Sequence, residues 1–162
     1  WLEARQMELR ARALTVWSRN DRMELLGITG AQALPIFSFR VRDGHGGLVH
    51  HQFFTRLLSD LTGVQARGGC ACAGPYGHRL LGIGKSGSDA IIAALENGAE
   101  TEKPGWVRLN LSALMSDEKA DLIIAAVDNL ARIAADYTNK YSVDTNTARF
   151  NALDFHRVPL VS

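Results

Sequence analysis

Hydrophobic and polar residues recur along the chain with two different periods, which predict helices and strands in turn. The apolar positions of residues 1–26 gather on one side of a helix. Residues 18–27 extend this pattern as a second short helix or as the approach to a strand, and Gly27 ends it. The segment LPIFSFRV, residues 34–41, is rich in β-branched and aromatic side chains, so we expect it to be a strand.

The following segments predict a turn, a helix and a short strand. Glycines and an Asp-Gly pair mark residues 42–47 as a turn. Apolar residues then recur at spacings of three and four over residues 48–61, which predicts a helix closed by Gly63. The segment VQAR, residues 64–67, indicates a short strand that leads into a glycine-rich loop.

Beyond this loop the pattern becomes helical again. Residues 78–83 are predicted to form one helical turn. Ser88 has the character of an N-cap, and the helix after it, residues 89–97, should end at Gly98. A Pro-Gly turn then introduces a strand within residues 102–112.

The last predicted strand has two distinct faces, and the last predicted helix has a clear start. In the strand, Val107, Leu109 and Leu111 occupy one face, and Trp106, Arg108 and Asn110 occupy the other. Ser116 should cap a long helix whose apolar stripe runs from Leu122 to Ala134. Residues 139–162 are a tail that the pattern assigns to no element.

This order of elements predicts the fold class. Helices and strands follow one another as α, β, α, β, loop, α, β, α, which favours an α/β fold of the α+β two-layer sandwich type. We expect a small sheet of about three to four strands that is covered by helices. At 162 residues the chain has the length of one domain.

Composition narrows the range of partners. Apolar residues make up 46% of the chain, enough for a core, and the net charge of +1 gives no general attraction to nucleic acid or to a membrane surface. No apolar run approaches the roughly 20 residues of a membrane span. Two cysteines are too few for a disulfide framework, so we expect a cytoplasmic protein.

The loop ARGGCACAGPYGHRLLGI, residues 66–83, holds both cysteines and is the first candidate site. Cys70 and Cys72 are compatible with three interpretations: small apolar residues, a nucleophile, or part of a metal site completed by histidines. In the nucleophile interpretation, the positive charge of Arg67 would lower the pKa of a nearby thiol.

Arg108 is the second candidate, because it is a charged residue in the middle of an apolar strand. Its side chain could reach along the surface to solvent. Alternatively, a guanidinium held by a strand could bind a carboxylate through two parallel hydrogen bonds. His45, His50 and His51 cluster near the predicted turn and the start of the helix. His50 or His51 could cap the helix or contact a site, but histidines in exposed loops are commoner, so we assign them no role.

Several of these segments together resemble a known family over residues 20–138. They are LPIFSF, HHQFFTRLLSDLTGV, QARGGCACAGPYGHRLL, KPGWVRLNLS and SDEKADLIIAAVDNLA. This pattern resembles the C-terminal small domain of class V pyridoxal-phosphate enzymes of fold type I. That group contains cysteine desulfurases, selenocysteine lyases and class V aminotransferases.

The resemblance implies roles for particular residues. The desulfurase motif Arg-x-Gly-x-x-Cys-x-x-Pro matches Arg67, Gly69, Cys72 and Pro75, so Cys72 would be the sulfur-accepting nucleophile. Arg108 would bind the carboxylate of an amino-acid substrate, and Arg67 would assist it. Cys70 and Ala71 stand where desulfurases often have histidine, so both a desulfurase-like and an aminotransferase reaction remain open.

The resemblance also implies what other parts of the enzyme supply. The family binds pyridoxal 5'-phosphate through a lysine of a large N-terminal domain, and it forms homodimers. None of Lys85, Lys103, Lys119 and Lys140 has the expected context, and the chain starts with Trp1. We therefore expect a C-terminal domain of a longer enzyme, inactive alone and without a cofactor-binding residue. A Cys/His metal-binding module and a stand-alone interaction domain are the alternatives.

Overall fold

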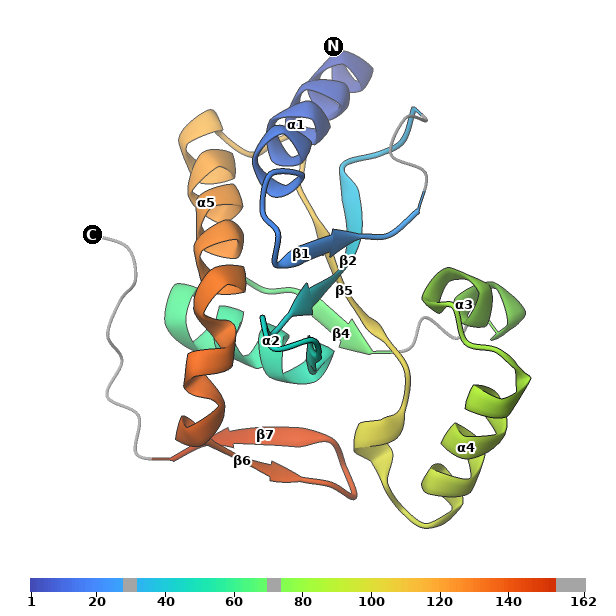
Figure 1. The fold of residues 1–162 in the computed structure, drawn as a ribbon. Coiled ribbons are helices and arrows are strands. Elements are labelled where there is room, and N and C mark those ends of the chain that lie inside the picture. Colours follow the sequence, from blue (N-terminus) through green and yellow to red (C-terminus); the bar gives the residue numbers. More distant parts are fainter. Residues whose placement is uncertain (28–31, 70–73, 154–162) are drawn as a thin grey trace.

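A five-stranded antiparallel sheet lies at the centre of the computed structural model, which describes residues 1–27, 32–69 and 74–153. The strands run in the order β1-β2-β5-β4, and β3 also pairs with β2 (Figure 1). Their bounds are Met23–Leu25 (β1), Ile36–Arg42 (β2), Leu48–Val49 (β3), Arg67–Gly69 (β4) and Trp106–Asn110 (β5). The predicted two-layer fold is confirmed, with five strands in the sheet rather than three or four.

Helices α1, α2 and α5 cover one face of this sheet. They span Leu2–Trp17 (α1), His51–Leu57 (α2) and Asp117–Ile133 (α5). The core between the layers contains Trp17, Phe39 and Phe54, all fully buried, and the rings of Phe39 and Phe54 meet edge to face at 5.9 Å. This face is apolar because the strands alternate, so every second residue points into the core.

Two further helices lie beside the sheet, far from α5 (Figure 1). Helices α3, Gly74–Leu81, and α4, Lys85–Glu96, lie away from α5 in Figure 1, and a 3-10 turn, Glu100–Glu102, leads back to β5. A Cβ atom on Gly77 of α3 would lie 3.9 Å from the indole of Trp106. This contact explains why Trp106 is buried although it alternates with the core-facing residues of β5.

The predicted tail begins with regular structure. After α5, a 3-10 helix, Ala134–Lys140, leads into a hairpin of β6, Tyr141–Asp144, and β7, Arg149–Ala152. The ring of Phe53 in α2 contacts Tyr141 at 5.3 Å and Phe150 at 5.1 Å between ring centroids. The hairpin therefore packs on α2 as a small second sheet.

The structure corrects the ends of the first two predicted helices. Helix α1 ends at Trp17, nine residues before the predicted end, and the residues that follow it turn into β1. The Asn20 side chain stabilises this turn, because its Oδ1 accepts from the Arg22 N–H at 3.0 Å. Leu48–Val49 forms β3 rather than helix, and α2 begins at His51.

The later boundaries are partly confirmed. Ser116 caps α5 as predicted, since its hydroxyl accepts from the Lys119 N–H at 3.3 Å. Gly63 ends the π-helical turn Leu58–Thr62 that extends α2, with a φ of 72°. Ser88 is not an N-cap, because α4 already begins at Lys85. Within the described ranges, no helix has both the length and the apolar character that crossing a bilayer requires.

Candidate functional site: an arginine pair on the open sheet face

Arg67 and Arg108 lie directly opposite each other on neighbouring strands. In the antiparallel register of β4 and β5, Arg67 faces Arg108, and on the other side of Arg108 lies Ser38 of β2. Side chains that are opposite in such a pair extend from the same face. Both arginines are exposed, so they project from the face of the sheet that is turned away from the core.

Within the described part of the chain, no acidic side chain pairs with these two arginines. Among the described residues, neither guanidinium has a hydrogen-bond or ion-pair partner. The two charges border an open hollow of about 480 Å³. It is lined by Ile36, Gln65, Ala66, Arg67, Arg108 and Asn110. The geometry thus presents two cationic groups to solvent at the edge of a space large enough for a small molecule.

A second arginine pair on the same face shares one carboxylate, which offsets half of its charge. One carboxylate oxygen of Glu24 accepts a hydrogen bond from Arg40, and the other accepts from Arg42 at 2.8 Å. Both arginines also sit on the outer face, because they alternate along β2 with the buried residues Phe39 and Val41. Glu24 therefore shows, within this sheet, how one carboxylate can join two arginines.

The predicted nucleophile lies outside the described residues. Cys70, Ala71 and Cys72 follow β4 directly, so the chain runs from Arg67 to Gly69 in the strand and enters the cysteine segment at once. It is next described at Gly74, where α3 begins. The role of Cys72 stays a prediction, and so does a metal site that would use either cysteine.

Close backbone packing holds the end of β4 in place. A Cβ atom on Gly105 would lie 2.5 Å from the carbonyl carbon of Gly69 and 2.6 Å from Nε2 of His51. A Cβ atom on Gly68 would lie 2.8 Å from the His51 carbonyl oxygen. Only glycine fits at such distances. These glycines therefore allow β4 to approach α2 and the segment before β5, which sets Arg67 opposite Arg108.

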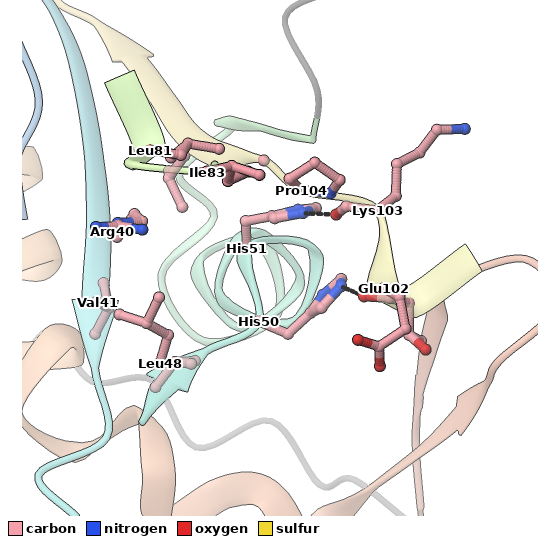
Figure 2. A pocket seen from close by; sticks show the side chains of 14 residues that line it. Arg40, Val41, Leu48, His50, His51, Leu81, Ile83, Glu102, Lys103 and Pro104 are labelled. Carbon is pink, nitrogen blue, oxygen red and sulfur yellow. Dashed lines mark hydrogen bonds between the residues drawn. The ribbon is translucent and has the colours of Figure 1, made fainter. Parts of the chain in front are cut away.

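His50 and His51 are anchored residues that the sequence did not single out. Figure 2 shows both side chains pointing from the start of α2 toward the segment before β5. The Nε2–H of His50 donates to the Thr101 carbonyl at 3.1 Å, and that of His51 donates to the Lys103 carbonyl at 3.2 Å. His50 also caps α2, since its Nδ1 accepts from the Gln52 N–H at 3.2 Å.

The two rings border a cavity of about 350 Å³ between β2, the segment before β5 and the residues that follow α3 (Figure 2). Burial, aided by repulsion from His50, lowers the pKa of His51 to about 4, so this ring is neutral at neutral pH. Its Nδ1 is buried without a hydrogen-bond partner, as is Nε of Arg40. The sequence pattern places both histidines inside the predicted helix of residues 48–61, so their position at the start of α2 comes from the structure alone.

The chain's own residues do not fit the attachment of pyridoxal phosphate. All four lysines are exposed, and none lines the hollow beside Arg67 and Arg108. A Schiff base needs a lysine next to the substrate site. Within the described ranges, no group of three or more His, Cys, Asp or Glu residues could hold a metal ion.

The comparisons with known proteins add no relative. No protein-family model matches this chain, and no curated protein matches it.

Proposed function

We propose that this chain is the carboxylate-binding small domain of a pyridoxal-phosphate enzyme of the class V aminotransferase and cysteine desulfurase type. One observation carries the proposal. The family resemblance marks two arginines as substrate-binding that are far apart in the sequence. They are direct neighbours in the sheet, and neither has an acidic partner among the described residues. The strand that holds Arg67 also leads directly into the predicted Cys72 loop.

In this proposal the arginine pair binds the α-carboxylate of an amino-acid substrate. Each guanidinium can donate to one carboxylate oxygen, as Arg40 and Arg42 do to Glu24. The strands fix where the two side chains begin, so binding orients the substrate for reaction. Pyridoxal phosphate and the lysine that binds it then belong to another domain of the enzyme, since none of the four lysines of this chain lines the hollow beside the arginine pair.

Cys72 decides between the two reactions that the family performs. In a desulfurase the Cys72 thiolate would attack the sulfur atom of a cysteine substrate as the bond between that sulfur and the substrate's Cβ breaks. The electron pair of the broken bond would stay with the carbon fragment, which becomes alanine, and the sulfur would remain on Cys72 as a persulfide. In an aminotransferase the amino group is transferred and Cys72 takes no part. We place the enzyme in the cytoplasm as a homodimer.

The test uses the enzyme that contains this chain, loaded with pyridoxal phosphate. We expect Arg108→Gln to raise KM for the amino acid at least about tenfold, because it removes one charge-assisted hydrogen bond. Arg42→Gln, on the same face, is the matched control and should leave KM unchanged. Equal KM values for wild type and Arg108→Gln would overturn the proposal.

Sulfide release from cysteine assigns the reaction. If the enzyme is a desulfurase, Cys72→Ala abolishes sulfide release and keeps the yellow colour of the bound cofactor. Transamination without sulfide release, unchanged in Cys72→Ala, assigns the aminotransferase reaction instead. An enzyme that stays colourless with pyridoxal phosphate would contradict the family assignment.

A further inference from the structure

The charge balance around Arg67 and Arg108 bears on the class of substrate. We infer that this site takes an amino acid with a second acidic group, so that the substrate brings two negative charges to the two arginines. The inference rests on the proposed function, because it assumes that the pair binds a substrate carboxylate.

The two guanidinium groups of the pair repel each other. Like charges that lie directly opposite each other on neighbouring strands destabilise a sheet. Arg67 and Arg108 occupy such positions, and no described acid relieves them. One carboxylate neutralises half of this charge, whereas a substrate with two acidic groups neutralises all of it.

The spacing of Arg40 and Arg42 on β2 provides a comparison. Arg40 and Arg42 share one carboxylate, but they are two residues apart along a strand, about 7 Å at the usual rise per residue. Arg67 and Arg108 are opposite one another, where Cβ atoms are about 5 Å apart. The side chains of Arg67 and Arg108 therefore start at least as close together as those of Arg40 and Arg42, so one small molecule with two acidic groups can offer one group to each guanidinium.

The lining of the hollow beside Arg67 and Arg108 also favours a second acidic group. Its described lining residues include no Asp or Glu, so none of them repels a second acidic group. Asn110 is exposed there and offers an amide donor. At about 480 Å³ the space exceeds what one carboxylate fills. Amino dicarboxylates, amino-acid sulfinates and phosphorylated amino acids share the required chemistry.

Succinate and butyrate form a matched pair of probes, since each has four carbons and only succinate has two carboxylates. Both are titrated into the 162-residue chain at one fixed ionic strength and neutral pH. The side-chain Nε–H signals of Arg67 and Arg108 are followed by NMR. We expect succinate to bind at least about fivefold more tightly, above the twofold advantage that two equivalent carboxylates give by statistics alone.

Three single variants locate the effect. In Arg67→Gln and in Arg108→Gln, the ratio of the two affinities should fall to about two or below, because one of the two cations is gone. In Arg42→Gln the ratio should stay at its wild-type value. Circular dichroism confirms that each variant is folded before its titration is interpreted.

The outcomes separate this inference from the proposed function. Equal binding of both acids at Arg67 and Arg108, within the statistical factor of two, would overturn the substrate class and leave the carboxylate site standing. The absence of any shift at these two arginines with either acid would overturn both. A succinate preference that persists in Arg67→Gln and Arg108→Gln would also overturn the inference, because it would reflect the general surface charge.

Discussion

Two pairs of arginines lie on the same face of one sheet. They differ in whether an acidic side chain of the described residues binds both members of the pair. Arg40 and Arg42 hold the carboxylate of Glu24 between them. Arg67 and Arg108 have no such partner in the described part of the chain. Both pairs lie on antiparallel strands of one sheet and on its outer face, so the acid that only the first pair has among the described residues is an informative difference.

The difference indicates two roles. A pair with its own acid is complete within the chain and contributes to the stability of β1 and β2. A pair without an acid is stabilised only when another molecule supplies the negative charge. We therefore assign a structural role to Arg40 and Arg42 and a binding role to Arg67 and Arg108. The predictions below test this assignment, starting with the largest expected effect.

Substituting Gly105 should separate the second pair while it leaves the first intact. In Gly105→Ala the new methyl group meets the backbone of Gly69 and the ring of His51 at distances that real Cβ atoms do not show. We expect a loss of about 2–3 kcal/mol in the free energy of unfolding, measured with urea. Butyrate and succinate should also lose affinity, since the displaced end of β4 carries Arg67.

Gly87→Ala is the control for this substitution. Gly87 lies inside α4, and a Cβ atom there would meet only a methyl carbon of Ile83, at 3.4 Å. Alanine favours helix over glycine by about 1 kcal/mol, so this variant should be as stable as wild type or more so. Equal effects of the two substitutions would contradict the close packing around Gly105.

Lowering the pH should destabilise the packing around Gly105, because His51 lies in it. The pKa of this ring is lowered to about 4 by burial, whereas an unfolded histidine titrates near 6.5. Below pH 6.5 the unfolded chain therefore binds the proton first, and stability falls until pH 4. Allowing for the partial exposure of the ring, we expect a loss of roughly 2 kcal/mol between pH 7 and pH 4.

Urea unfolding of wild type and His51→Gln at several pH values measures this effect. The slope of stability between pH 6.5 and pH 4 should be clearly smaller in the variant. Asp43, Asp117 and Asp144 do not obscure it, because their pKa values are lowered from 3.8 and they lose their stabilising charge at still lower pH. An identical slope in both proteins would show that His51 is not held neutral by burial.

Removing the acid of the first pair should make it resemble the second. Glu24→Gln leaves Arg40 and Arg42 without a carboxylate, and the side chains involved are partly exposed. We expect a loss of about 1 kcal/mol in stability. The Nε–H signals of Arg40 and Arg42 should then respond to added succinate, as those of Arg67 and Arg108 do. A variant of full stability would remove the structural role of Glu24.

Supplying an acid to the second pair should have the smallest effect on stability. Arg67→Glu places a carboxylate directly opposite Arg108, where opposite charges attract across strands. We expect a gain of about 0.5 kcal/mol in urea unfolding together with loss of carboxylate binding. Arg67→Gln should give a smaller gain, since it only removes repulsion. A destabilised Arg67→Glu would mean that the two positions are not neighbours.

The sequence predicts the elements with strong local signals. Phe37, Phe39 and Val41 alternate over a strand, and Ser116 begins a long amphipathic helix, so β2 and α5 are found where expected. Strands β1, β3, β6 and β7 have two to four residues each and are defined by pairing with distant segments. A local pattern does not contain that information, which explains why these strands were missed or left open.

In the candidate site, too, local signals identify single residues, whereas their arrangement depends on strand pairing. Residue type and motif select Arg67 and Arg108 separately, but only the register of β4 and β5 shows that they face each other. The neutralisation of Arg40 by Glu24 also depends on strand pairing. His51 gives no local signal at all, because its burial depends on Gly105, which is far away in the chain.

A crystal structure of the chain grown with a high concentration of alanine tests the carboxylate site most directly. We expect the carboxylate of alanine between Arg67 and Arg108, with one oxygen within hydrogen-bond distance of each guanidinium. Glu24 binds Arg40 and Arg42 in this way. Either guanidinium in an ion pair with an acid of its own chain, or alanine bound elsewhere with this pair empty, would contradict it.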